Sequence, residues 1–131
     1  VPRVPEGRLL GPLAHAMTDT SDGVADAAHL VAGASHRKIV LVAEQLPLHP
    51  RLRKLARPVP QRLRTAFYGG DYELFATVEP SRVPRIRAAF RRLGCPITVI
   101  GRVETGHGAW LELGGKARPL PLAGWRHFAS R

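Results

Sequence analysis

A short acidic stretch, Asp19-Thr20-Ser21-Asp22-Gly23, carries the residue types that point most directly to chemistry in this chain. Carboxylate and hydroxyl oxygens are hard ligands, which suit a Mg²⁺ ion that bridges phosphate groups. Backbone N–H groups at the start of a following helix would also favour a phosphate. We therefore interpret Asp19, Ser21 and Asp22 as the first half of a Mg²⁺–phosphate site.

A second acidic pair, Asp71 and Glu73, follows Gly69-Gly70 and opens an apolar, strand-like run. Paired glycines let the backbone turn tightly or approach a ligand closely. Together with Asp26, the two stretches hold five of the ten acidic residues in a chain that has twenty Lys and Arg. Solvated acids are normally scattered along a sequence, so this concentration calls for a functional reason.

A helix cap is the competing interpretation of the first stretch. Thr20 or Ser21 would cap a helix that runs to Ala34, and Asp22 in its first turn would suit the helix dipole. A cap accounts for Ser21 and Asp22 but leaves Asp19 unexplained. Because caps are far commoner than metal sites, the spacing alone keeps both interpretations open.

Composition limits the class of protein. The chain has 131 residues, of which 44% are hydrophobic and 23% charged, and this predicts one globular domain over residues 1–131. The sequence contains no membrane-spanning apolar run and no signal-peptide pattern, so we expect a soluble, cytoplasmic protein with no membrane partner. Cys95 is the single cysteine, and we expect a buried thiol there.

The formal net charge of +10 has two explanations. It fits a surface that binds a polyanion, and it also fits a composition that is simply rich in Arg. Aromatic residues do not alternate with the basic runs, so we do not expect nucleic acid as the partner.

The sequence has no GxxxxGK[ST] loop, GxSxG elbow or HExxH helix, and its six histidines never fall into zinc-ligand spacing.

Hydrophobic patterning predicts mixed α and β elements. Apolar alternation predicts a strand over residues 72–78, and an apolar stripe predicts a helix over 81–93 before a strand over 97–103. We expect this portion to form a right-handed crossover. The other expectations are an extended lead-in over 1–7, a helix or strand over 8–17, a buried strand over 39–43, basic helices over 51–66, and a hairpin that pairs 97–103 with 109–113.

Several motifs, taken in order, resemble one known family. They are His15-Ala-Met-x-Asp19-x-Ser21-Asp22-Gly23, Ser35, Leu46-Pro47-Leu48, Gly69-Gly70-Asp71-Tyr72-Glu73-Leu74, Ile100-Gly101-Arg102-Val103 and Gly124-Trp125-x-His127-Phe128. This series resembles the C-terminal half of thiamine-monophosphate kinases. The opening Pro2-Arg3-Val4, with Gly7 and Leu9-Leu10, resembles the segment that joins the two halves in that family, so the likeness covers essentially the whole chain.

The resemblance implies a fold and a reaction. The fold would be α/β (mixed α+β), a layered sheet with flanking helices like the C-terminal domain of aminoimidazole-ribonucleotide synthetase. The reaction would move the γ-phosphate of ATP onto thiamine monophosphate to give thiamine diphosphate. On the family's pattern, Asp19 and Asp22 would bind Mg²⁺, and Ser21 would contact the nucleotide phosphates.

On the substrate side, the resemblance implies a carboxylate from Asp71 or Glu73 and the aromatic ring of Trp125. The bacterial family form reads Gly-Gly-Glu-Asp-Tyr-Glu-Leu, whereas Gly70 directly precedes Asp71 here, so the choice between the two acids stays open. The family's N-terminal half, which supplies most ATP and Mg²⁺ ligands and the dimer interface, is not in this sequence. We therefore expect this chain to act with that N-terminal domain in a full-length homodimer, and to be inactive when isolated.

Two alternatives stay open. One is an inactive or truncated relative that acts as a binding module, and the other is a different ATP-using synthetase or maturation protein of the same superfamily. The Gly-Asp-Tyr-Glu-Leu and Trp-x-His-Phe motifs disfavour the second alternative.

Overall fold

The computed structural model describes residues 2–48, 67 and 72–122 of the chain. Its helices are α1 (Val4–Leu10), α2 (Val24–Ser35) and α5 (Val83–Arg92), with short 3₁₀ turns η1 (Ala43–Gln45) and η2 (Pro80–Arg82). Its strands are β1 (Ala14–Asp19), β2 (Lys38–Val42), β3 (Leu74–Val78), β4 (Gly101–Glu104), β5 (Gly108–Leu113) and β6 (Lys116–Pro119). The fold is mixed α+β, as expected.

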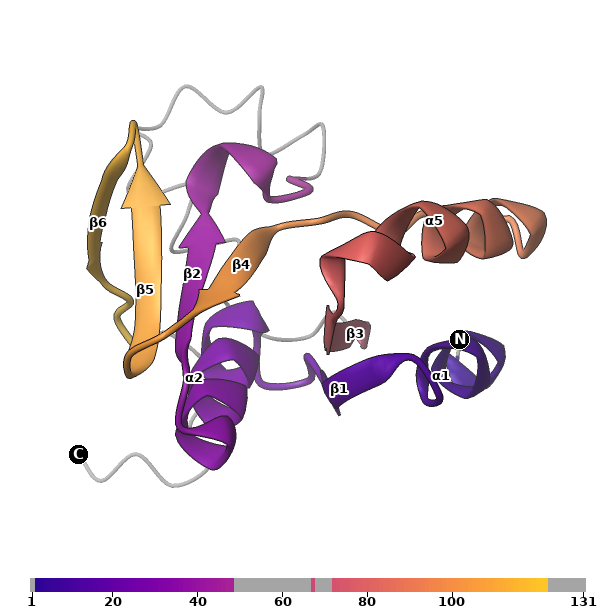
Figure 1. The fold of residues 1–131 in the computed structure, drawn as a ribbon, viewed down its shortest axis with the longest axis horizontal. Helices are drawn as coiled ribbons and strands as arrows, with labels where there is room; N and C mark the ends of the chain where they lie inside the picture. The colour runs from indigo at the N-terminus through magenta and orange to yellow at the C-terminus, as the bar shows by residue number, and fades with distance from the viewer. Residues whose placement is uncertain (1, 49–66, 68–71, 123–131) are drawn as a thin grey trace.

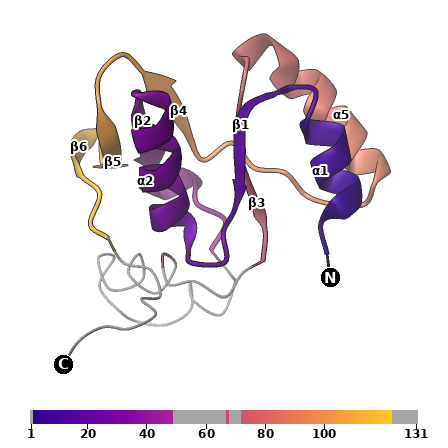
Figure 2. The same ribbon diagram turned by 90° about the horizontal axis from the view of Figure 1, so that it is seen from below.

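The strands form two sheets. β1 and β3 make an antiparallel pair, and the other four strands lie in the order β4-β2-β5-β6. The central strand β2 is antiparallel to β4 and parallel to β5. Figure 1 shows the four-stranded sheet on one side of the molecule and the two helices α1 and α5 on the other. In the view from below, β1 and β3 lie between α2 and the α1–α5 pair (Figure 2).

Two hydrophobic clusters fill the spaces on either side of β3. The first lies between α2 and the four-stranded sheet and includes Phe75 and Phe67. The second lies under α1 and α5, and Leu74, Ala76 and Val78 pack against it. The alternation expected for residues 72–78 is therefore confirmed, because successive side chains of a strand point to opposite faces.

The expected helix over 81–93 is also confirmed in its main part. Ile86 and Phe90 are the buried residues of α5, and its arginines are exposed. The helix ends at Arg92, one residue before the end of the expected range, and Leu93 is 46% exposed. Among the described residues, no helix is long and apolar enough to cross a membrane.

The extended lead-in expected over residues 1–7 is wrong, because α1 begins at Val4. Pro5 lies in the first turn of this helix, where a missing N–H costs nothing and the fixed φ angle suits the helix. The chain then turns at Gly11 and enters β1, so residues 8–17 contain the end of a helix and most of a strand. The basic helices expected over 51–66 lie outside the described residues, and Phe67, which follows them, is buried.

The predicted hairpin between residues 97–103 and 109–113 is wrong, because β2 lies between β4 and β5. The buried residues Ile39, Val40 and Leu41 of β2 need a neighbouring strand on each edge, and this tertiary demand overrides the local turn signal. The predicted right-handed crossover over residues 72–103 is also wrong. Such a crossover joins two parallel strands of one sheet, whereas β3 and β4 belong to different sheets. The hairpin of this region joins β5 to β6, through Gly114 and Gly115 at φ +57° and +75°.

Candidate functional site

The Asp19–Gly23 loop joins the end of β1 to the start of α2. The helix begins at Val24, and its N-cap is Gly23 at φ +109°, with no capping hydrogen bond from a side chain. Ser21 and Thr20 are therefore not caps, and Asp22 lies before the helix instead of in its first turn. The helix-cap interpretation of this stretch is wrong, which leaves the composition of the loop to be explained by something other than helix capping.

The loop is shaped by hydrogen bonds to Asp19. The carboxylate oxygen Oδ1 of Asp19 accepts the backbone N–H of Ser21 at 3.3 Å and the Ser21 hydroxyl at 2.8 Å. This contact brings one carboxylate and one hydroxyl together at the strand end, and both Asp19 and the neighbouring Asp22 are exposed. Oxygen donors held in this way suit a hard cation such as Mg²⁺ and the phosphates that accompany it.

Glu73 is fixed beside this loop. The backbone N–H of Thr20 donates to the Glu73 carbonyl at 3.0 Å, and the backbone N–H of Glu73 donates to the Thr20 hydroxyl at 3.1 Å. These contacts continue the β1–β3 pairing one step beyond its last register pair, Asp19 with Leu74. The structure thus brings two stretches together that are separated by more than fifty residues in the sequence.

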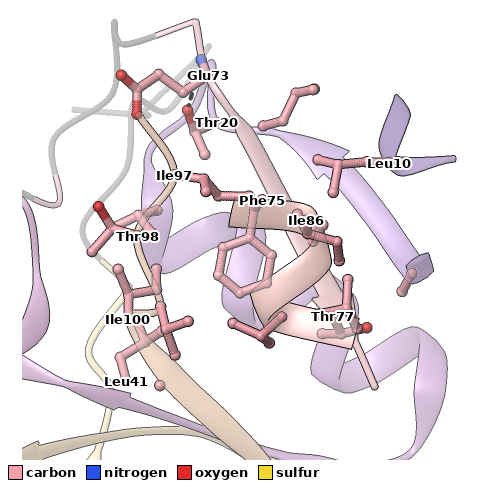
Figure 3. Close-up of a pocket in the computed structure, with 18 of the residues that line it drawn as sticks. Leu10, Thr20, Leu41, Glu73, Phe75, Thr77, Ile86, Ile97, Thr98 and Ile100 are labelled. Atoms are coloured by element: carbon pink, nitrogen blue, oxygen red, sulfur yellow. Dashed lines mark hydrogen bonds between the residues drawn. The ribbon is translucent and has the colours of Figure 1, made fainter. Parts of the chain in front are cut away.

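Two hollows meet at this place. A cavity of about 980 Å³ runs beside β3, with Thr20 and Glu73 in its lining together with apolar side chains such as Phe75 and Ile100. Figure 3 shows Thr20 and Glu73 side by side at one end of β3, with Phe75, Ile97 and Ile100 further along the cavity.

A smaller hollow of about 430 Å³ is bordered by two of the predicted acids, Asp19 at the end of β1 and Glu73 just before β3. Asp19 and Glu73 line it together, with Arg3 and the exposed ring of Tyr72. A residue proposed for the metal and a residue proposed for the substrate therefore border the same hollow. Sequence reasoning assigned Arg3 no role in the site and considered Thr20 only as a helix cap, since an Arg near an N-terminus and a Thr inside an acidic motif carry no distinctive pattern of their own.

The other two predicted substrate residues, Asp71 and Trp125, lie outside the described residues. Within the ranges that are described, no group of three or more His, Cys, Asp and Glu converges on a point that would hold a metal ion. Asp19 and Asp22 fit Mg²⁺ by the chemistry of their oxygens, and their role as its ligands stays a prediction.

Cys95 does not extend the chemistry of the site. Burial raises the pKa of its thiol, and the neighbouring Glu6 carboxylate acts in the same direction. The thiol is half-buried beside Arg3, whose guanidinium lies 3.7 Å from the sulfur and 3.2 Å from the Glu6 carboxylate. A thiol with a raised pKa is a poor nucleophile, so Cys95 serves packing between α1 and the segment after α5.

Comparison with known proteins places these features in a family. Residues 4–112 match the family model described as AIR synthase related protein, C-terminal domain. A thiamine-monophosphate kinase of Halobacterium salinarum is 40% identical over 128 residues, and one of Pyrococcus abyssi is 32% identical over 128 residues. These matches cover 97% of this chain but 41% and 38% of the two relatives, so the chain spans about two fifths of their length.

Solved structures give the same result. A thiamine-monophosphate kinase from Stenotrophomonas maltophilia aligns with a TM-score of 0.78 at 32% identity, over 86% of this chain and 35% of that one. A structure of AaThiL complexed with AMPPCP and TMP aligns with a TM-score of 0.70 at 30% identity, over 96% and 38%. The hydrogenase maturation protein HypE of Escherichia coli reaches 0.74 at 26% identity, over 92% and 39%. The chain therefore belongs to the family of AIR synthase related proteins, as a C-terminal domain of the kind found in thiamine-monophosphate kinases.

Proposed function

We propose that this chain is the C-terminal half of a thiamine-monophosphate kinase, which transfers the γ-phosphate of ATP to thiamine monophosphate in the presence of Mg²⁺. The observation that carries the proposal is the junction of the Asp19–Gly23 loop with Glu73 at one hollow. The names of the relatives support the reaction, and the AaThiL complex with AMPPCP, an ATP analogue, and TMP supports the two substrates.

On the phosphate side, Asp19 and Asp22 would hold Mg²⁺, and Ser21 would contact the nucleotide phosphates. A bound Mg²⁺ neutralises the charge that develops on the transferred phosphoryl group. The chain's own contribution is positioning: the hydrogen bonds between Ser21 and Asp19 hold the hydroxyl and the carboxylate in one orientation before any ligand arrives. Such preorganisation is the main way in which proteins assist phosphoryl transfer, because little covalent chemistry is left to side chains.

On the substrate side, a carboxylate and an aromatic ring would recognise thiamine monophosphate. Its thiazolium ring is cationic, so a nearby carboxylate attracts it and an indole face stabilises it by a cation–π contact. Glu73 is our first choice for this acid, and the support for it is that Glu73 lines the hollow together with Asp19. Asp71 stays as the alternative acid, and Trp125 is proposed from the family pattern.

We further propose that the full-length protein has an N-terminal domain, which supplies the remaining ligands for ATP and Mg²⁺, and that it forms a homodimer. The short coverage of the relatives, 38% and 41%, supports a partner domain of greater length than this chain. Residues 1–131 would form one domain of that protein. Because ATP is the proposed co-substrate, we place the protein in the cytoplasm.

The direct test is phosphate transfer by the full-length protein, with thiamine diphosphate measured as the product. We expect Asp19→Asn to lower kcat/KM by roughly a hundredfold or more, because it removes a charge from the phosphate site. We expect Glu73→Gln to raise the KM for thiamine monophosphate by about tenfold, with the KM for ATP changed by less than about threefold.

Glu112→Gln is the matched control, because Glu112 pairs with Arg102 on the four-stranded sheet and lines neither hollow. It should leave both KM values unchanged. A wild-type protein that hydrolyses ATP or binds it but never forms thiamine diphosphate would overturn the proposal. That result would favour a different ATP-using member of the superfamily.

A further inference from the structure

Thr20 is the one polar residue among those described that is buried, with 8% of its surface exposed. It lies between Asp19, which is exposed, and Ser21, which is half-buried. A buried hydroxyl needs a hydrogen-bond partner, because an unsatisfied polar group is costly away from water. The sequence gives no separate reason for a polar side chain at this inward-facing position, so its contacts explain its presence.

Thr20 uses both its backbone and its side chain to join two segments. Its backbone N–H donates to the Glu73 carbonyl at 3.0 Å, and its hydroxyl accepts the backbone N–H of Glu73 at 3.1 Å. Its own carbonyl accepts the backbone N–H of Gly23 at 2.9 Å, which closes the loop before α2. Figure 3 shows the Thr20 side chain directed at the backbone of Glu73.

The side-chain contact is the informative one. Past the last register pair of the β1–β3 ladder, Asp19 with Leu74, the Thr20 hydroxyl takes the place that a backbone carbonyl would occupy in a longer ladder. The N–H of Glu73 therefore depends on a side chain, and the backbone of Glu73, from which its carboxylate projects, is held by the residue in the middle of the acidic loop. An apolar residue of the same shape would keep the strand pairing but lose this contact.

We propose that Thr20 is a positioning residue that couples the phosphate side of the site to the substrate side. It holds Glu73 in a fixed relation to Asp19 and Ser21, so that a substrate bound at Glu73 is aligned with the phosphoryl donor. This inference rests on the proposed function. Misplacement of a reacting group by about 1 Å costs up to roughly a hundredfold in rate. Loss of the hydrogen bond between the Thr20 hydroxyl and the Glu73 N–H therefore has a measurable kinetic effect.

The test compares Thr20→Val, Thr20→Ser and Thr18→Val in the full-length protein. Thr20→Val removes the hydroxyl and keeps the branched shape, and Thr20→Ser keeps the hydroxyl. Thr18→Val removes a hydroxyl two residues earlier on β1, away from the Glu73 contacts. We expect Thr20→Val to lower kcat/KM for thiamine monophosphate by about tenfold or more, with the KM for ATP within about threefold of wild type. Thr20→Ser and Thr18→Val should stay close to wild type.

A second measurement is independent of activity. Hydrogen exchange of the Glu73 backbone N–H reports its hydrogen bond directly, and we expect it to speed up by at least about tenfold in Thr20→Val and to stay slow in Thr20→Ser. Unchanged exchange of the Glu73 N–H in Thr20→Val overturns the inference. Faster exchange in Thr20→Val with wild-type kinetics also overturns it. A Thr20→Ser variant that is as impaired as Thr20→Val does the same. If the wild-type protein makes no thiamine diphosphate, the proposed function fails, and the exchange data alone decide whether Thr20 positions Glu73.

Discussion

Gly101 occupies the point where β4 comes closest to β2. A Cβ atom built on Gly101 would lie 2.0 Å from the carbonyl oxygen of Val40, a distance that no real side chain tolerates. Val40 itself is fully buried, so its backbone has no room to retreat. The Ile100-Gly101-Arg102-Val103 motif, which the sequence presents only as a resemblance, thus has a steric reason at its glycine.

Substitution of Gly101 by Ala should destabilise the protein. We expect a loss of about 1–3 kcal/mol or more in the free energy of unfolding, because overpacking against a buried strand forces the backbone to shift. Gly33→Ala is the matched control, since Gly33 lies near the end of α2 with nothing within 4 Å of the added Cβ. It should be neutral or stabilise by up to about 1 kcal/mol. Denaturant unfolding of both variants measures the difference, and equal stabilities would contradict the steric argument.

Part of the candidate site could be predicted from residue types alone. The predicted ligands Asp19, Ser21 and Asp22 follow from the chemistry of oxygen donors, and the structure places Asp19 and Glu73 at one hollow. Their roles toward Mg²⁺ and substrate stay predictions. The part played by Thr20 was not predictable, because a long-range contact with Glu73 exists only after β1 and β3 have paired.

Among the structural elements, the turn between β5 and β6 is supported from outside the hairpin. The Glu44 carboxylate in η1 accepts the backbone N–H of Gly114 at 2.8 Å. This hydrogen bond is the main cause that lowers the pKa of Glu44 below its ordinary value of 4.5, and the backbone N–H of Glu44 adds to it. The contact connects the turn after β2 to the turn after its parallel neighbour β5, whose ends lie side by side.

The lowered pKa of Glu44 predicts a pH dependence of stability. A carboxylate with a folded-state pKa below 4.5 stabilises the protein fully above that value, and the contribution is lost as the pH falls through the folded-state pKa. Glu44→Gln removes the titration, so its melting temperature should fall less than that of wild type between about pH 6 and about pH 3. Gln45→Ala, next to it and without a change of charge, should keep the wild-type slope. Parallel curves for wild type and Glu44→Gln would disprove the link.

Elements with strong periodicity were predictable, and the order of strands was not. Alternation identified β3 and the apolar stripe identified α5, because burial on one face leaves a local signature. Helix α1 was missed because two prolines in Val1–Gly7 suggested an extended chain, although the first turn of a helix accepts proline. The position of β2 between β4 and β5 depends on which strand buries the most apolar surface, and nearest neighbours in the sequence do not reveal it.

At the scale of the whole molecule, the described residues form two hydrophobic clusters and a candidate ligand site. The clusters involve every described helix and both sheets, so we expect the chain to fold on its own. The proposed function assigns the remaining ligands for ATP and Mg²⁺ to an N-terminal domain. We therefore expect the chain to keep its fold but lose its activity when it is produced alone.

We expect the isolated 131-residue chain to fold cooperatively and to transfer phosphate poorly or not at all. Circular dichroism through a thermal scan measures the first outcome, and formation of thiamine diphosphate measures the second. The full-length protein assayed at the same concentration is the control. Robust conversion of thiamine monophosphate by the isolated chain would show that the missing ligands are not needed.

The position of β3 between two cores makes the site resistant to error during folding. A slip of one residue against β1 would turn Phe75 out of the first cluster and drive Leu74 and Ala76 into it, so both cores would be mispacked at once. The same slip would carry Glu73 away from Thr20. The observed alignment satisfies both cores, and it is also the alignment that brings Glu73 beside Thr20. Selection for a well-packed interior therefore also preserves the geometry of the site. We expect mutations that loosen either core to disturb that geometry.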